Sequence, residues 1–361
     1  MTLPPSTSLR GRGAAFNPSN RFERLSIRPG PSELADDWDT EDVGSGTHFY
    51  RDHSRSILAS NQSPDIGYAH SVNAYRGCEH GCIYCYARPT HEYLGFSLGL
   101  DFETRIMVKL EAAALLRRAL SKKSWRPQPI AMSGVTDIYQ PAERHFGLTR
   151  QLLGVLLDFR NPVTLITKNA LILRDLEVLT ELARRNLVRV ALSVTTLNEN
   201  LRRRMEPRTS TAARRLSAVS RLAEAGVPVG VMMGPVIPGL TDTEIPAVVA
   251  AAAVAGANWA GYNMVHFPHG TAELFLDWLE REYPQARSRV ESRVREVRGG
   301  EMNDSRFGSR MTGEGPYAES VAALFAAACR RAGLPKAQTR LDVSRFRVPT
   351  AQPGLFDLPE D

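Results

Sequence analysis

The stretch Val188–Met233, VRVALSVTTLNENLRRRMEPRTSTAARRLSAVSRLAEAGVPVGVMM, contains one complete strand–helix–strand unit. Two short apolar, β-branched runs at 188–194 and 227–233 predict buried strands. Residues 211–226 between them carry the apolar stripe of a helix packed on one side, formed by Leu216, Val219, Leu222 and Ala223. Gly226 is placed to end this helix. This order of elements predicts two parallel strands joined by a right-handed crossover.

The same alternation recurs along the chain and indicates the fold class. Further strands are predicted at residues 72–76, 129–133, 163–167 and 258–264, and further helices at 109–123, 149–159, 173–185 and 243–256. The resulting six strand–helix units are too few for a closed eight-stranded barrel. We therefore expect an α/β fold in the form of an open, partial (βα)6 barrel. Its ligand site should lie at the carboxyl ends of the strands, where the connecting loops converge.

Composition changes on both sides of this core domain, which we place at residues 64–285. Residues 1–63 are rich in Pro, Ser, Gly, Arg and Asn, with a basic part before the acidic stretch 32–42. Such a segment is predicted to be a mobile arm. Residues 286–340 form a predicted helical extension, with helices over 286–300 and 319–334. Residues 341–361 are predicted to be a flexible tail.

Charge and hydropathy exclude some classes of protein. The formal net charge of the 361 residues is +6, and it is carried almost wholly by arginine because the chain has only five lysines. Arginine suits phosphate and carboxylate partners, although the same surplus is also common on solvated helix faces. The first residues lack the apolar region of a secretory signal. The longest apolar run, 247–257, is too short for a bilayer span. We expect a cytoplasmic protein with no membrane contact.

Three of the four cysteines lie within eight positions of YRGCEHGCIYCYAR (75–88). The pattern is C-x3-C-x2-C, formed by Cys78, Cys82 and Cys85. Such bunching indicates a metal site rather than a disulfide framework. Zinc could use the three thiols with His80 or His91, but structural zinc usually takes two ligand pairs separated by a longer loop. Inert buried thiols would leave the bunching unexplained. A four-iron cluster with three thiolate ligands explains it, and it leaves one iron open to a substrate's amino and carboxylate groups.

The cysteine spacing, with an aromatic residue before the last cysteine, resembles the radical S-adenosylmethionine superfamily. The stretch NAYRGCEHGCIYCYARPTHEYLG (73–95) is more narrowly similar to the spore-photoproduct-lyase-like branch, and within it to a group of uncharacterised bacterial proteins. The resemblance extends over most of residues 10–335. It includes VTDIYQPAE, LITKNALILRDLEVL, VMMGPVIPGLTD and FGSRMTGEGPY.

This resemblance implies a [4Fe–4S] cluster on the three cysteines and S-adenosylmethionine chelated to the open iron. In that superfamily, one electron from the cluster cleaves the sulfonium to give methionine and a 5′-deoxyadenosyl radical, which takes a hydrogen atom from the substrate. An electron donor such as flavodoxin or ferredoxin is then required. The protein sets a low cluster potential, aims the radical and excludes water.

The resemblance also implies roles for residues near the strand ends. Tyr84 would contact the adenine, and Lys168, directly after the strand 163–167, would bind the cofactor's carboxylate. Thr136 and Asp137 would face the methionine amino group. The remaining candidates for cofactor binding are Ser193, Glu206, Arg208 and Gly234. Several of these residue types are equally at home as strand, turn or cap residues.

Tyr86 follows the last cysteine and is the candidate catalytic residue. In the photoproduct lyases, a tyrosine at this place belongs to the path that returns hydrogen to the product, together with a cysteine on the second strand. Here Gly134 stands at that place, and Cys329 is predicted to be a core residue. The departure argues against repair of the spore photoproduct, but not against radical generation. Other residues that could line a substrate pocket are Tyr139, Gln140, Glu143 and His145.

The chain is therefore predicted to be a radical S-adenosylmethionine enzyme that acts on nucleic acid. One alternative keeps this chemistry but takes a peptide, protein or small metabolite, and another is a zinc-stabilised binding protein without catalysis. Gln352–Phe356 (QPGLF) resembles the Q-x-x-L-F peptides that bind the bacterial sliding clamp. With the arginine surplus, this favours nucleic acid. Against it, the sequence shows no nucleic-acid module with interleaved aromatic residues.

Overall fold

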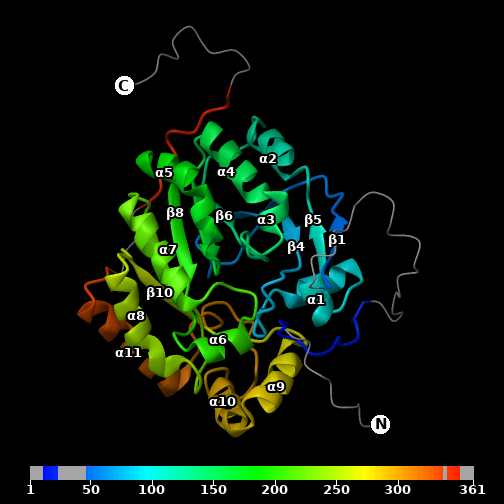
Figure 1. Cartoon of the computed structure of the whole chain (residues 1–361), viewed down its shortest axis with the longest axis vertical. Coiled ribbons are helices and arrows are strands. Elements are labelled where there is room, and N and C mark those ends of the chain that lie inside the picture. Colours follow the sequence, from blue (N-terminus) through cyan, green and yellow to red (C-terminus); the bar gives the residue numbers. More distant parts are fainter. Residues whose placement is uncertain (1–10, 23–45, 336–339, 350–361) are drawn as a thin grey trace.

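The computed structural model describes residues 11–22, 46–335 and 340–349. Its largest sheet has seven strands, in the order β10 (Ala260–Met264), β9 (Val229–Val236), β8 (Val188–Ser193), β7 (Val163–Thr167), β6 (Ile130–Met132), β3 (His70–Val72) and β2 (Leu58–Ser60). Every pair from β10 to β3 is parallel, and β2 is antiparallel to β3. The predicted α/β fold with six parallel strands is confirmed (Figure 1).

Crossover helices flank this sheet, as Figure 1 shows. They are α2 (Ala112–Leu120), α4 (Leu148–Asp158), α5 (Leu176–Arg184), α7 (Ala212–Glu224) and α8 (Ile245–Val254). In α7, the Thr211 side chain caps the first turn by accepting from the backbone N–H of Arg214. Val219 and Leu222 are buried as the stripe predicted, and Gly226 follows the helix with a φ of +75°. Because helices cover the sheet, β8 is almost continuously buried rather than alternating.

The predicted strand 72–76 is wrong, since the structure divides it between two sheets. Its first part lies in β3, whereas β4 (Tyr75–Arg76) belongs to a three-stranded sheet in the order β1 (His48–Arg51), β5 (Arg105–Val108), β4. The chain changes sheet at Asn73, whose side-chain oxygen accepts from the backbone N–H of Val135. From there β4 leads directly into residues 77–88, the loop that carries the three clustered cysteines.

Shorter helical segments complete the core and differ from the predicted boundaries. Residues 173–175 belong to a 3₁₀ turn that precedes α5, and α2 begins three residues later than predicted. The short segments are η1 (Arg88–Leu94), α1 (Leu100–Thr104), α3 (Glu143–Phe146), η2 (Ala170–Asp175), α6 (Glu199–Met205) and η3 (Asp242–Glu244). Among the described residues, none of the helices has the length and apolar character needed to cross a membrane.

The segments on either side of the core pack against it where the structure describes them. Within the predicted arm, β1 pairs with β5, β2 extends the large sheet, and residues 11–22 contact η1 and α1. The described part of the arm is therefore fixed by backbone pairing and buried hydrogen bonds. Within the predicted tail, the Phe346 ring lies 6.2 Å from that of Phe159, and the Arg347 backbone N–H donates to the Phe159 carbonyl. Gln352–Phe356 lies outside the described residues.

The helical extension begins earlier than predicted. It contains α9 (Thr271–Glu282), α10 (Pro284–Glu296) and α11 (Gly315–Arg331), of which the sequence analysis missed α9. Two aromatic residues of α9, Phe275 and Trp278, are fully buried in a second hydrophobic cluster that also contains Cys82 and Tyr84. The extension therefore supports the cysteine loop, while α11 packs against α8.

Candidate active site

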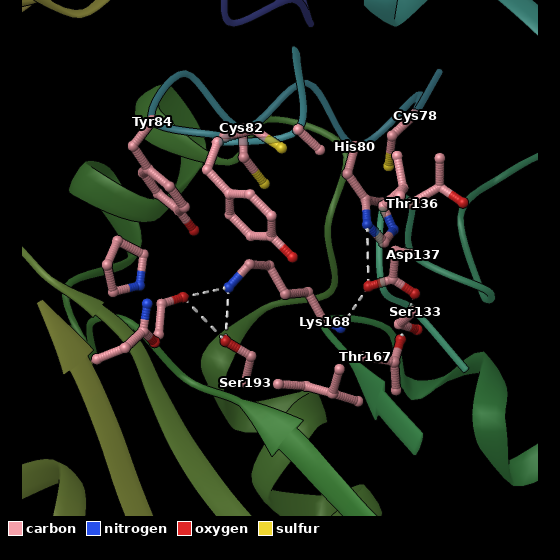
Figure 2. Close-up of a pocket in the computed structure, with 18 of the residues that line it drawn as sticks. Cys78, His80, Cys82, Tyr84, Ser133, Thr136, Asp137, Thr167, Lys168 and Ser193 are labelled. Atoms are coloured by element: carbon pink, nitrogen blue, oxygen red, sulfur yellow. Dashed lines mark hydrogen bonds and ion pairs between the residues drawn. The ribbon is translucent and has the colours of Figure 1, made fainter. Parts of the chain in front are cut away.

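The carboxyl ends of the parallel strands open into a pocket that is closed on the opposite side by the cysteine loop, residues 77–88 (Figure 2). Most of the predicted site residues line it: Cys78, Cys82, Tyr84, Cys85, Tyr86, Thr136, Asp137, Lys168, Ser193 and Gly234. The expectation that the site lies at the strand ends is met, because the last residues of β7, β8 and β10 meet there with the loop after β6.

Two glycines give the cysteine loop its path. Gly77 and Gly81 have φ values of +81° and +65°, a region that favours glycine. A Cβ on Gly81 would lie 2.6 Å from the Glu103 carboxylate, so this backbone approaches its support too closely for a side chain. The Cys78 backbone N–H donates to the Phe102 carbonyl at 2.8 Å, and further backbone hydrogen bonds tie the loop to the last residue of α6 and to Arg208 beyond it. The loop is held in one conformation on its outer side, while its thiols face the pocket.

The three thiols of this loop are free of disulfide bonds and line the pocket. Burial raises the pKa of Cys78, Cys82 and Cys85, so thiolates there require a compensating cation. In the described parts of the chain, no three His, Cys, Asp or Glu side chains are grouped to hold a single metal ion. A four-iron cluster does not require that grouping, because each thiolate binds a different iron.

The two histidines considered as zinc ligands have other surroundings. The Nδ1 atom of His80 lies 3.4 Å from a carboxylate oxygen of Asp137. His91 is buried beside Phe96 and Phe102, with ring centroids 5.3 and 5.6 Å away, and it does not line the pocket. Burial lowers the pKa of His91 to about 3, so it is neutral at pH 7.

Lys168 lies at the centre of the pocket's polar side (Figure 2). Its Nζ atom donates to Ser193 Oγ at 2.5 Å and to the carbonyl oxygen of Gly234 at 2.7 Å. The same atom is 3.5 Å from a carboxylate oxygen of Glu206 and 5.5 Å from the centroid of the Tyr84 ring. One ammonium therefore joins the ends of β7 and β8 and the middle of β9 to the cysteine loop.

Glu206 lies behind the pocket lining. Its buried carboxylate accepts hydrogen bonds from the Tyr84 hydroxyl and from Arg215, the latter at 2.5 Å. Burial would raise the pKa of Glu206, but the charges of Arg215 and Lys168 outweigh burial and lower it, so the group is ionised. Because two cations face one carboxylate, this corner has a surplus of positive charge that suits an anionic ligand.

Asp137 and Thr136 follow β6 and are largely occupied by protein partners. The Asp137 carboxylate accepts from the Thr167 hydroxyl and from the Lys168 backbone N–H, both at 2.7 Å. Burial opposes ionisation, yet His80 and these hydrogen bonds lower the pKa of Asp137. The Thr136 hydroxyl donates to the Tyr75 carbonyl at 3.3 Å. Asp137 therefore brings a negative charge to the pocket wall, while its oxygens brace the neighbouring strand end.

Other expected residues lie elsewhere. Arg208 does not line the pocket, because its guanidinium pairs with Glu79 at 3.1 Å on the outer side of the cysteine loop. The substrate-pocket candidates Tyr139, Gln140 and Glu143 are fully buried. Tyr139 donates to Asp175, Glu143 accepts from the Tyr75 hydroxyl and from Arg174, and Gln140 holds the backbone of the cysteine loop. His145 is exposed and is not part of the pocket lining.

Tyr86 stands at the opening of the pocket, with 49% of its surface exposed. Its hydroxyl donates to the carbonyl oxygen of Gly134 at 2.8 Å. Gly134 stands at the position where the photoproduct lyases are expected to carry a cysteine. Within the described chain, the remaining cysteine is Cys329, which is buried in the main core as predicted. No fourth thiol therefore reaches Tyr86 from the described residues.

Besides the Thr167 hydroxyl described above, three polar residues of the pocket were not predicted from the sequence. Ser133 follows β6 with a φ of +89°, an uncommon conformation for a non-glycine residue. Asn263 lies beside Gly234, where a Cβ would come within 2.8 Å of its side-chain oxygen. His266 stacks on Tyr86 at 5.7 Å, and burial lowers the pKa of His266 to about 4. The available signal for the last two was a polar residue near the end of the predicted strand 258–264, Asn263, and another just after it, His266.

Three comparisons relate this chain to known proteins. Residues 72–252, half of the chain, match the family model described as the radical SAM superfamily. An uncharacterised protein of Mycobacterium tuberculosis is 38% identical over 226 residues, 62% of this chain and 66% of its own length. An uncharacterised protein of Methanocaldococcus jannaschii is 27% identical over 61% of this chain and 78% of its own. This chain thus spans slightly less than two thirds of its mycobacterial relatives.

Solved structures share the fold. Spore photoproduct lyase complexed with dinucleoside spore photoproduct superposes with a TM-score of 0.58 at 16% identity, over 85% of each chain. A mutant of that lyase with bound AdoMet and the dinucleoside superposes with a TM-score of 0.57. Proteins of the radical SAM superfamily use a [4Fe–4S] cluster and S-adenosylmethionine, so the family match favours an iron–sulfur cluster over zinc at the cysteine loop. The recognition made from the cysteine motif is confirmed: the chain belongs to the radical SAM superfamily and has the fold of spore photoproduct lyase.

Proposed function

We propose that this protein binds a [4Fe–4S] cluster through Cys78, Cys82 and Cys85 and S-adenosylmethionine beside it, and that it abstracts hydrogen from a nucleic-acid substrate. One observation carries the metal and cofactor part: the three thiols of one loop and the positively charged corner around Lys168 line opposite sides of the same pocket. The three thiols fit a [4Fe–4S] cluster with one open iron, because soft thiolates suit iron–sulfur clusters and no fourth cysteine among the described residues lines the pocket.

The surrounding residues would bind and orient the cofactor. Lys168 would hold the carboxylate of the cofactor, because Lys168 and Arg215 together carry one positive charge more than the Glu206 carboxylate between them neutralises. Gly234 lines the pocket and would let the adenosine approach its backbone closely, because glycine has no side chain. Bound there, the cluster and S-adenosylmethionine would supply one electron and a 5′-deoxyadenosyl radical. The apolar side chains of Phe102, Ile166 and Val265 would keep water from the pocket.

The metal site is tested by replacing one of its thiols. We expect Cys82→Ala, purified without oxygen, to lose the iron and sulfide of the wild-type protein and to form no 5′-deoxyadenosine with S-adenosylmethionine and dithionite. Cys329→Ala is the matched control, because Cys329 lies in α11 within the core, and it should retain iron, sulfide and turnover. Release of 5′-deoxyadenosine by the Cys82 variant would contradict the assignment of this loop.

A nucleic-acid substrate is favoured by three further observations. The fold is that of an enzyme whose structures contain a dinucleoside, and arginine dominates the positive charge of the chain. Half-exposed Tyr86, stacked on the partly buried His266, also offers an aromatic face at the pocket opening. Repair of the spore photoproduct is not proposed, because Gly134 stands where that reaction is expected to need a thiol. A one-electron donor of the flavodoxin or ferredoxin type would serve the cluster.

The substrate class is tested by stimulation of cofactor cleavage. Wild-type protein is incubated without oxygen with isotopically labelled S-adenosylmethionine and with DNA, RNA, peptide or metabolite pools. We expect DNA or RNA to increase 5′-deoxyadenosine formation and to acquire label. If residues 350–361 act as a tether, their deletion should reduce the effect only when a sliding clamp is present. Stimulation by peptides or metabolites alone would favour the alternative substrate class and leave the metal site intact.

A further inference from the structure

A buried ion pair lies directly behind the cysteine loop, on the side away from the strand ends. The guanidinium of Arg88, in η1, is 2.5 Å from the carboxylate of Glu103, in α1, and both side chains are completely inaccessible to solvent. Neither residue lines the pocket, so the pair has no part in binding the cofactor directly. Fully buried ion pairs are retained at a desolvation cost, which calls for a reason beyond stability.

The positive member of the pair contacts the backbone of a cluster ligand. Arg88 donates to the carbonyl oxygen of Cys82 through Nε at 3.2 Å and through Nη2 at 3.0 Å. Its Nη1 atom donates to the carbonyls of Leu98 and Gly99. The guanidinium thereby links the middle cysteine to η1 and α1, and its charge is held a few bonds from the Cys82 sulfur.

The negative member is held by the N-terminal segment, residues 11–22. The backbone N–H groups of Gly13 and Ala14 donate to the two carboxylate oxygens of Glu103 at 3.0 and 2.9 Å. A Cβ on Gly13 would lie 2.0 Å from the carbonyl oxygen of Gly81, so this segment touches the cysteine loop itself. The segment lies outside the part of the chain that matches the superfamily.

We propose that the Arg88–Glu103 pair, completed by the backbone of Gly13 and Ala14, positions the cysteine loop and sets the reduction potential of the cluster. The inference rests on the metal site proposed above. Cluster potentials depend on nearby charge and hydrogen bonding, and charges interact strongly where water is excluded. Arg88 alone would favour the more negative, reduced cluster and raise its potential. Glu103 offsets this charge and keeps the potential low, as reductive cleavage of a sulfonium requires.

Two charge variants of the full chain test this proposal, because they predict shifts of opposite sign. Each is reconstituted without oxygen and titrated with dithionite while the reduced cluster is followed by electron paramagnetic resonance. We expect Glu103→Gln to raise the midpoint potential and Arg88→Gln to lower it, with the double variant close to wild type. Unshifted potentials at wild-type iron content, or shifts of the same sign, would overturn the proposal. Wild-type protein that assembles no cluster would instead overturn the metal site.

A third variant decides the question if the charge variants fail to fold. Gly13→Ala keeps both charges but forces the N-terminal segment away from Gly81. We expect it to change the resonance line shape and the midpoint potential of the cluster. Gly67→Ala is the matched control, because a Cβ there meets nothing within 4 Å, and it should behave as wild type. A Gly13→Ala protein with wild-type spectrum and potential would show that the segment does not act on the cluster.

Discussion

Lys168 is the residue on which binding of the cofactor is expected to depend most. Its ammonium is held by Ser193, the Gly234 carbonyl and Glu206, so it is ordered before any ligand arrives. A pre-ordered cation loses little conformational entropy on binding a carboxylate. The Arg215 charge leaves Glu206 paired even without the lysine, which makes substitution of Lys168 compatible with a folded protein.

We expect Lys168→Ala to retain iron but to bind S-adenosylmethionine more weakly by roughly tenfold or more. A hydrogen bond to a charged group contributes about 1.5–3 kcal/mol, and about 1.4 kcal/mol corresponds to a tenfold change in affinity. Equilibrium binding to the reconstituted, oxidised protein measures the effect, and iron analysis confirms that the cluster is present. Exposed Lys122 provides the control Lys122→Ala. Equal affinities in both variants would remove Lys168 from the cofactor site.

Among the elements, β9 and β10 are fitted to each other with little space to spare. Gly230 lies in β9 beneath the ring of Trp259, and a Cβ at this position would come within 2.1 Å of the ring. The Val231 backbone N–H donates to the Trp259 carbonyl at 3.1 Å, so β9 and the residue that precedes β10 cannot easily separate. The same strand carries Gly234 to the pocket. Packing between two strands thus determines where part of the cofactor site lies.

Gly230→Ala is expected to lower the free energy of unfolding by about 2–3 kcal/mol, because overpacking forces the ring and backbone apart. Thermal or denaturant unfolding measures the loss, and weaker binding of S-adenosylmethionine should accompany it as β9 moves. Gly154→Ala, within α4 with nothing within 4 Å of its Cβ, should instead be neutral or stabilise by about 0.5–1 kcal/mol. A Gly230→Ala protein as stable as wild type would show that Trp259 has room to rearrange.

At the scale of the whole molecule, both ends of the described chain are tied to the core. Residues 11–22 pack behind the cysteine loop, and residues 340–349 pack beside Phe159. The same burial leaves neutral histidines inside, among them His91 with a pKa of about 3. A histidine in the unfolded chain titrates near 6.5. Below pH 6.5 this histidine binds a proton in the unfolded state but stays neutral in the folded state, so stability is lost as the pH falls from 6.5 toward 3.

We expect His91→Phe to reduce this loss of stability in acid. Between pH 7 and pH 5 the free energy of unfolding of the wild type should fall by about 2 kcal/mol more than that of the variant, since each pH unit contributes up to about 1.4 kcal/mol per proton. Denaturant unfolding at the two pH values measures the difference. The exposed residue His145 provides His145→Phe, which should follow the wild type. Parallel pH profiles for all three proteins would exclude His91 as the titrating group.

The sequence alone determined what depends on neighbouring residues. Strand and helix periodicity and the Gly226 stop are local properties, and the alternation of strands with helices predicts parallel strands; the structure agrees with each of these. The spacing of the cysteines is equally local, and it led to the superfamily that the family match confirms. Placing Lys168 at a strand end was also enough to bring it to the pocket, because parallel strands end at the same edge.

Only the tertiary structure decided which distant side chains meet. Glu103 meets Gly13 across 90 residues, Tyr84 meets Glu206 across 122, and Tyr86 stacks on His266. Arg208 pairs with Glu79 outside the pocket although Glu206, two residues earlier, reaches Lys168. The physical reason is that such contacts follow from how helices and loops pack over the sheet, which no local pattern encodes. The spacing of the cysteines indicates the chemistry, but the tertiary packing behind the cysteine loop decides which residues hold that loop in place.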